Sequence, residues 1–166
     1  MKKRRIKTLS VMILSIAIVL VVFSSSVSAE YFGGGPGDDN WTGTNGPDYA
    51  DGFGGNDILN GAGDQDVIVG GTGSDTITGG PGMDILDSGT YGGSDGEPDT
   101  INAADGEVDF INCGEEDIPN LNADDNDLIN IVDEEGNTLF NGTYAELKLW
   151  LRLLVIKAIW DMFQLL

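Results

Sequence analysis

The amino-acid sequence predicts an all-β fold, a solenoid of short parallel strands that ends in a helix. Six nonapeptides run without a gap from Gly34 to Asp87. Tandem repeats of short period are typical of solenoids, in which each repeat stacks on its neighbours. A hydrophobic segment then closes the sequence, and it begins with Thr143-Tyr-Ala-Glu146, a capping box that starts a helix.

The six nonapeptides share three positions. They read GGPGDDNWT, GTNGPDYAD, GFGGNDILN, GAGDQDVIV, GGTGSDTIT and GGPGMDILD, with glycine first, aspartate sixth and an apolar residue eighth. We expect a tight turn at positions 1 to 6, where glycine permits positive φ, and a short strand at positions 7 to 9. Alternation along the strand then directs the position-8 side chains into a core. These residues are Trp41, Ala50, Leu59, Ile68, Ile77 and Leu86.

This pattern resembles the GGxGxDxUx nonapeptide, in which U is a bulky apolar residue, of the RTX or hemolysin-type calcium-binding repeat proteins. Gly70–Thr78 and Gly79–Asp87 match it fully, whereas Gly61–Val69 has Asp64 in place of the fourth-position glycine. The resemblance implies a right-handed parallel β-roll in which two repeats make one coil. Successive aspartates would then lie at alternate edges of the roll.

The repeated turns are candidate calcium sites, because calcium takes carboxylate and backbone carbonyl oxygens in a tolerant geometry. The resemblance implies about four internal ions, each between repeats i and i+2: Asp39 with Asp57, Asp48 with Asp66, Asp57 with Asp75, and Asp66 with Asp84. Magnesium demands stricter geometry, and zinc is disfavoured because the chain has no histidine and one cysteine. The predicted metal-site residues are Asp39, Asp48, Asp57, Asp66, Asp75, Asp84, Gly43, Gly52, Gly54, Gly61, Gly63, Gly70, Gly71, Gly73, Gly79, Gly80 and Gly82.

The repeated aspartates also bear on stability. A single aspartate in a turn is more often an Asx-turn that needs no metal, but six copies in one register favour metal binding. Stacked carboxylates about 5 Å apart repel by roughly 3 kcal/mol per pair at an effective dielectric of about 20. We therefore expect the roll to fold only when calcium neutralises these charges.

The regular array, with the residues before it, covers residues 30–87, and weaker repeats follow over residues 88–130. The motif Asp-x-U-x recurs at Asp99, Asp109 and Asp127, at intervals of 15, 10 and 18 residues counted from Asp84. These intervals predict further coils with a loop inserted between residues 88 and 98. A polar hinge is expected over residues 131–142.

The N-terminal residues predict a signal peptide over residues 1–29. Basic residues crowd its start, an apolar run extends from Leu9 to Phe23, and Val27-Ser28-Ala29 supplies a small-residue cleavage site. The apolar run is shorter than the ~20 residues that a membrane span needs. Cleavage before Glu30 is therefore preferred to an uncleaved anchor, and a secreted, extracellular protein is expected.

The chain is strongly acidic, with 28 acidic and 8 basic residues. Removal of residues 1–29 takes away five basic residues and no acidic one, which leaves a net charge of 3 − 28 = −25. No basic residue lies between Lys7 and Lys148. Such a surface repels nucleic acid and attracts cations, so calcium ions are the expected partners.

The hydrophobic segment over residues 143–166 predicts a helix from about Tyr144 to Leu165. Its polar residues lie on opposite sides, so the pattern leaves open whether it caps the roll, contacts a membrane or protein partner through residues 144–166, or serves secretion. A cap is favoured because solenoids need their last coil covered. Cys113 is the only cysteine, which rules out an intrachain disulfide and favours a small buried side chain.

These observations favour a binding protein over an enzyme. The absence of histidine excludes histidine-based triads and the HExxH zinc site, and nothing sets a catalytic pair of carboxylates apart from the many others. The sequence therefore predicts a secreted, non-enzymatic calcium-binding β-roll protein. The alternative is a cell-surface or envelope-associated adhesion module that docks through its C-terminal helix.

Overall fold

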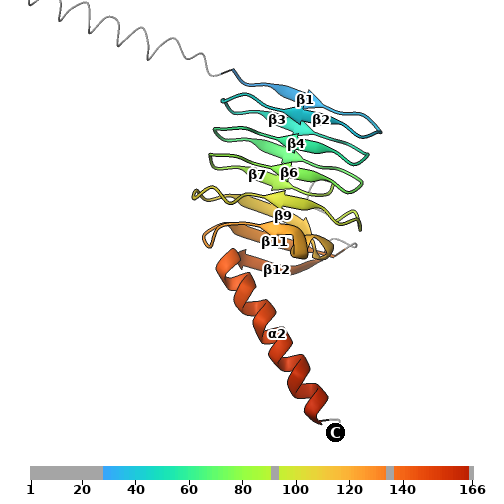
Figure 1. The fold of residues 1–166 in the computed structure, drawn as a ribbon, viewed down its shortest axis with the longest axis vertical. Coiled ribbons are helices and arrows are strands. Elements are labelled where there is room, and N and C mark those ends of the chain that lie inside the picture. Colours follow the sequence, from blue (N-terminus) through green and yellow to red (C-terminus); the bar gives the residue numbers. More distant parts are fainter. Residues whose placement is uncertain (1–27, 91–93, 134–136, 165–166) are drawn as a thin grey trace, which may run out of the picture.

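The computed structural model describes residues 28–90, 94–133 and 137–164. The predicted signal peptide lies outside the described residues, except for its last two. The strands stack as rungs from β1 down to β12, and the helix α2 lies at the far end of the stack (Figure 1). The predicted all-β solenoid with a C-terminal helix is thereby confirmed.

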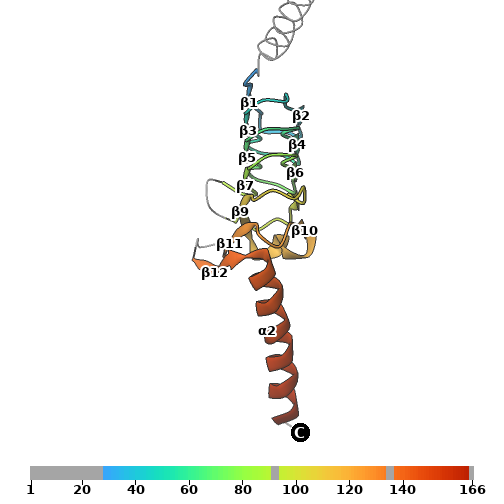
Figure 2. The same cartoon turned by 90° about the vertical axis from the view of Figure 1, so that its left-hand side faces the viewer.

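Two sheets form opposite walls of the solenoid (Figure 2). All strand pairs are parallel except β11–β12, which is antiparallel. The seven-stranded sheet contains, in order, β1 (Tyr31–Gly33), β3 (Tyr49–Asp51), β5 (Val67–Val69), β7 (Ile85–Asp87), β9 (Phe110–Gly114), β11 (Leu128–Val132) and β12 (Thr138–Thr143). The five-stranded sheet contains, in order, β10 (Leu121–Asn122), β8 (Thr100–Asn102), β6 (Thr76–Thr78), β4 (Ile58–Asn60) and β2 (Asn40–Thr42).

In the regular array, strand neighbours within a sheet are two repeats apart along the chain. Leu59 pairs with Ile77 across β4 and β6, and Ile68 pairs with Leu86 across β5 and β7. One repeat therefore contributes to one wall and the next repeat to the other. The predicted strands at positions 7 to 9 are present in all six repeats.

The core is the column of eighth-position side chains between the two walls. Leu59, Ile68, Ile77 and Leu86 are completely buried. The same column continues through the weaker repeats, where β9 and β11 are each five residues long and add further side chains to the interior. These continuing residues are Ile101, Ile111, Cys113, Ile129 and Ile131.

The turns of the last four regular repeats use left-handed backbone at positions 2 and 4. At Gly71 φ is +109°, and a Cβ there would lie 2.3 Å from the carbonyl oxygen of Phe53 one coil earlier, so only glycine fits without displacement. Three non-glycine residues keep positive φ at equivalent positions, namely Phe53, Ala62 and Asp64. Each costs roughly 1–2 kcal/mol of backbone strain, which the stacked turns on either side must offset.

The segment predicted as a hinge, residues 131–142, instead contains the end of β11 and most of β12. β12 turns back and pairs antiparallel with β11, with Ile129 opposite Gly142. Without this strand, β11 would present an unpaired row of N–H and C=O groups at the end of the sheet. Among its described residues, the polar Thr138 and Asn141 lie in a strand that covers an edge.

A short 3-10 helix, η1 (Glu115–Asn120), leads into β10, and α2 (Tyr144–Gln164) follows β12 directly. The backbone N–H of Thr143 donates to Glu146 Oε2 at 2.9 Å, and the N–H of Glu146 donates to Thr143 Oγ1 at 3.3 Å, as the predicted capping box requires. Leu147 is completely buried in the core, and the Tyr144 hydroxyl donates to the carbonyl of Leu121 at 3.2 Å.

Only the beginning of α2 therefore covers the roll. Beyond its first turns the helix runs away from the strands, as both views show (Figures 1 and 2). Leu149, Leu153 and Leu154 are exposed. The predicted capping role applies to the part of the helix around Tyr144 and Leu147.

This division of α2 predicts different costs for two matched substitutions. Leu147→Ala removes a buried side chain from the last layer of the core and should cost about 2–5 kcal/mol. Leu153→Ala changes an exposed side chain of the same helix and should stay within about 0.5 kcal/mol. Thermal unfolding of the calcium-saturated variants, followed by circular dichroism, measures both. Equal melting temperatures for the two variants would show that α2 does not close the core.

Candidate metal centre

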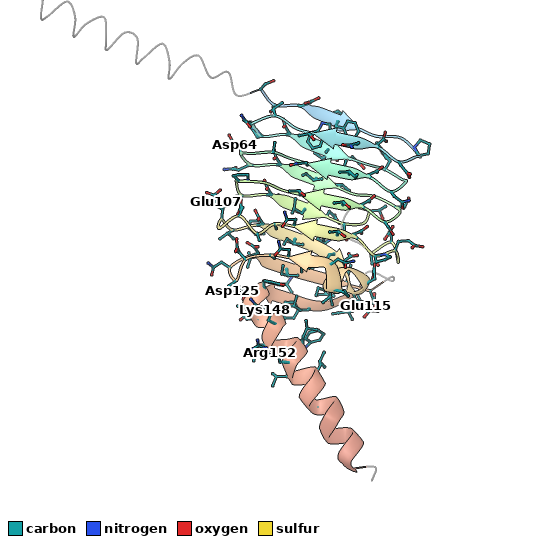
Figure 3. All side chains as sticks on the ribbon, viewed as in Figure 1. Asp64, Glu107, Glu115, Asp125, Lys148 and Arg152 are labelled. Carbon is teal, nitrogen blue, oxygen red and sulfur yellow. The ribbon has the colours of Figure 1, made fainter. Side chains whose placement is uncertain are left out.

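Two columns of aspartates run along opposite edges of the solenoid. Each aspartate lies above the aspartate that is one coil further along the chain, and all except the one in η1 end a turn directly before a strand. Side chains drawn as sticks show acidic residues at the turns of both edges, among them Asp64, Glu107 and Asp125 on one and Glu115 on the other (Figure 3). One column contains Asp39, Asp57, Asp75, Asp99 and Asp117, and the other contains Asp48, Asp66, Asp84, Asp109 and Asp127.

Hydrogen bonds between main chain and side chain link each column. The backbone N–H of Asp39 donates to Asp57 Oδ1 at 2.7 Å, and the N–H of Asp48 donates to Asp66 Oδ1 at 2.8 Å. The same bond joins every later pair of neighbours in both columns, at 2.6–3.0 Å. The structure thus brings together all four predicted pairs.

Asp117 was not recognised from the sequence as a member of this series. It lies in η1, and the apolar residue that enters the next strand, Leu121, follows it by four positions instead of two. A usable signal was present, because Asp117 follows Asp99 by 18 residues, the length of two nonapeptides. The 18-residue spacing, and not the Asp-x-U-x motif, indicates that Asp117 belongs to the column.

The second carboxylate oxygen distinguishes members of the regular array. In Asp57, Asp66, Asp75 and Asp84 the Oδ2 atom is buried and has no hydrogen-bond donor. In the first two repeats the same oxygen is satisfied within its own turn: Gly35 N–H donates to Asp39 at 2.7 Å and Thr44 N–H to Asp48 at 2.6 Å. In each predicted pair, the aspartate that comes later in the sequence is therefore the one whose Oδ2 atom has no donor.

The first-position glycines make room for these oxygens. A Cβ at Gly61 would lie 2.1 Å from Asp66 Oδ2 and 2.7 Å from the carbonyl oxygen of Gly79 in the next coil. A carboxylate oxygen and a carbonyl oxygen thus approach the same space, which the missing side chain leaves open. The corresponding glycines are Gly43, Gly52, Gly61, Gly70 and Gly79.

The remaining predicted glycines have other surroundings. Those with positive φ shape the turn: Gly71, Gly73, Gly80 and Gly82. Gly54 donates its N–H to the carbonyl of Gly35 at 3.2 Å, within the stack of turns. At Gly63 a Cβ would meet only the Pro81 carbonyl oxygen at 3.7 Å, an ordinary contact, so this position has no steric need for glycine.

Burial and like charges make the ionised aspartates costly in the absence of a cation. Burial, followed by the charges of neighbouring carboxylates, raises the pKa of Asp66, Asp75 and Asp84 to about 6, although the backbone hydrogen bond to each works in the opposite direction. Within the described ranges, every basic side chain lies in α2. Lys148 pairs with Asp125 in the last turn, and compensating positive charge at the other described turns would have to come from solution.

The carboxylate and carbonyl oxygens at these turns are ligands that suit a hard cation. Among the residues that the structure describes, no three acidic or thiol side chains gather closely enough to hold an ion by themselves. An ion at these turns would combine one or two carboxylates with backbone oxygens, which calcium accepts and a tetrahedral nitrogen or sulfur site for zinc does not. The orphaned oxygens and the space at the first-position glycines fit calcium.

The raised pKa values predict how the calcium-free protein responds to pH. Because the folded state holds protons that the unfolded chain releases, folding is favoured below about pH 4, and this contribution is lost as the pH rises through about 6 for Asp66, Asp75 and Asp84 and about 8 for Asp99. In chelator, circular dichroism should show more β structure at about pH 4 than at about pH 8. With calcium the order should reverse, since the ion competes with protons. β structure that increases with pH in chelator would contradict the assignment.

Comparison with known families agrees with this geometry. The model of the RTX calcium-binding nonapeptide repeat matches residues 33–68 and 60–90, in four copies. No curated protein and no solved structure matches the chain. The matched residues are those that form the stacked turns and strands of the regular array, so the segment from residue 33 to residue 90 carries RTX calcium-binding nonapeptide repeats.

Proposed function

We propose that this chain is a secreted, non-enzymatic protein that binds calcium at its aspartate turns and folds as it does so. The observation that carries the proposal is the set of buried carboxylate oxygens without a hydrogen-bond donor, at Asp57, Asp66, Asp75 and Asp84. An ionised oxygen in such a place is costly unless a positive charge lies beside it. Calcium binding also follows from the RTX repeats themselves.

The residues that would hold the ion come from two consecutive coils. At the site of Asp66, they are the Asp66 carboxylate and the carbonyl of Gly79, which both border the space at Gly61. The Asp48 N–H holds the other oxygen of Asp66 in place, which orients the carboxylate before an ion arrives. A bound calcium ion supplies positive charge that neutralises both carboxylates of a pair.

Folding should depend on this neutralisation. Each strand of the regular array adds one side chain to the core, so the core is narrow. The turns contain many glycines, whose ordering costs roughly 1–2 kcal/mol per residue in backbone entropy. Carboxylates stacked along both edges add repulsion that no basic side chain of the described turns offsets. Binding energy from the ions then becomes folding energy.

Secretion and the lack of catalysis rest on sequence observations. The signal-peptide pattern over residues 1–29 supports export. The absence of histidine supports a non-enzymatic role, and the described strands and helix form the roll and its cap, without a second domain between them.

A calcium titration tests the proposed function. Mature chain in chelator should be largely disordered, and millimolar calcium should induce β structure by circular dichroism, whereas the same concentration of magnesium should not. Asp66→Asn should weaken the calcium response, because it removes the charge of a buried ligand. Asp64→Asn is the matched control, since Asp64 is exposed and asparagine also tolerates its positive φ. An unchanged spectrum on addition of calcium would refute the proposal.

The exposed part of α2 favours a second candidate function, envelope association. Leu149, Leu153 and Leu154 are exposed on a helix that extends beyond the roll and that also carries Arg152 (Figure 3). Within the described ranges, no helix is long and apolar enough to cross a membrane. These residues would form the contact surface through which an adhesion module docks on a membrane surface or on a protein of the envelope.

Truncation separates the two candidates. A chain that ends at Leu151 keeps the capping part of α2 and loses the projecting part. It should retain the calcium-induced fold in circular dichroism. If α2 serves docking, the truncated protein should appear in the culture medium while the full chain remains with the membrane fraction. Equal distribution of both chains would exclude docking through this segment.

A further inference from the structure

Two turns outside the family match share a motif of their own. Residues 94–99 read Ser-Asp-Gly-Glu-Pro-Asp, and residues 104–109 read Ala-Asp-Gly-Glu-Val-Asp. Both end in an aspartate followed by a strand, β8 in the first case and β9 in the second. They continue the two aspartate columns beyond the regular array.

The first aspartate of each motif attaches the turn to the preceding coil. Asp95 accepts the N–H of Glu97 at 3.1 Å with one oxygen and the N–H of Gly73 at 2.7 Å with the other. Asp105 does the same with Glu107 at 2.8 Å and Gly82 at 3.0 Å. These side chains have donors for both oxygens and serve as structural anchors.

The last aspartate of each motif is different. Asp99 and Asp109 are 1% and 0% exposed. Their Oδ1 atoms accept the N–H groups of Asp75 at 2.6 Å and Asp84 at 2.8 Å, across 24 and 25 residues instead of the usual 18. Their Oδ2 atoms are buried and have no donor. Both carboxylates therefore share with Asp57 a buried oxygen that has no donor.

The final aspartate of each column has no such free oxygen. Asp117 Oδ2 accepts the hydroxyl of Ser88 at 2.7 Å and the N–H of Gly114 at 2.8 Å. Asp127 Oδ2 accepts the N–H of Asp124 at 2.5 Å. Donors from the protein thus complete the carboxylates at this end, as they do for the first aspartate of each column at the other end.

We propose that Asp99 and Asp109 are two additional calcium ligands, which form sites with Asp75 and Asp84, and that Asp117 and Asp127 end the columns without an ion. This inference rests on the proposed function. A buried carboxylate oxygen without a donor needs a proton or a cation, and the described basic residues lie in α2, where Lys148 pairs with Asp125 and not with Asp99 or Asp109. Oxygen donors from a carboxylate and the backbone suit calcium.

The number of bound ions tests the inference on the unaltered chain. In the part of the chain that the structure describes, six buried aspartate oxygens lack a donor, so the inference expects six bound calcium ions, whereas the regular array alone accounts for four. Native mass spectrometry of the calcium-saturated full mature chain counts them directly. A count of four would overturn the inference and leave the proposed function intact. A chain that binds no calcium would refute the proposed function itself.

Matched substitutions test which residues hold the added ions. Asp99→Asn and Asp109→Asn should each reduce the count by one, and the double variant by two. Asp117→Asn and Asp127→Asn are the controls, because they alter aspartates of the same columns whose oxygens already have donors, and they should keep the full count. Circular dichroism in calcium verifies that each variant folds. Unchanged counts in folded Asp99→Asn and Asp109→Asn, or an equal loss in the two controls, would overturn the assignment.

Discussion

The hydrogen bond from the backbone N–H of one aspartate to the carboxylate of the aspartate one coil further on is the interaction on which the structure depends. It gives the backbone N–H that precedes each strand an acceptor. It also fixes one oxygen of the buried carboxylate in place. The second oxygen is then left inside the stack of turns, next to like charges. The geometry that joins the coils thus leaves buried carboxylate oxygens that need a proton or a cation.

Two kinds of turn place an aspartate in this position, and they do so through different contacts. The regular repeats use glycine, whose missing Cβ admits the carboxylate, as at Gly61. The turns at residues 94–99 and 104–109 use an aspartate side chain, Asp95 or Asp105, to bind the backbone of the coil before. Both kinds place the final aspartate in the same relation to its neighbour. An insertion can therefore enlarge a turn without a change in the strand register.

The two ends of the solenoid are closed to different degrees. At the C-terminal end, β12 pairs with the last parallel strand, and Leu147 of α2 fills the final layer of the core. At the other end, the ring of Phe32 stacks on Trp41 with centroids 5.7 Å apart, and Tyr31 on the outer face of β1 is 71% exposed. Among the described residues, one end of the solenoid is therefore covered by a helix and the other by the first strand.

The sequence by itself determined the repeat, the strands, the buried column from Trp41 to Leu86 and the helix start at Thr143, because each depends on contacts within one repeat or one helical turn. It did not determine which aspartate oxygens lack a donor, since donors such as Ser88 come from other coils. Nor did local patterns identify Asp117 or β12, whose roles depend on the strand or turn beside them. Only the tertiary structure, which sets one coil on the next, decided where charge is left uncompensated.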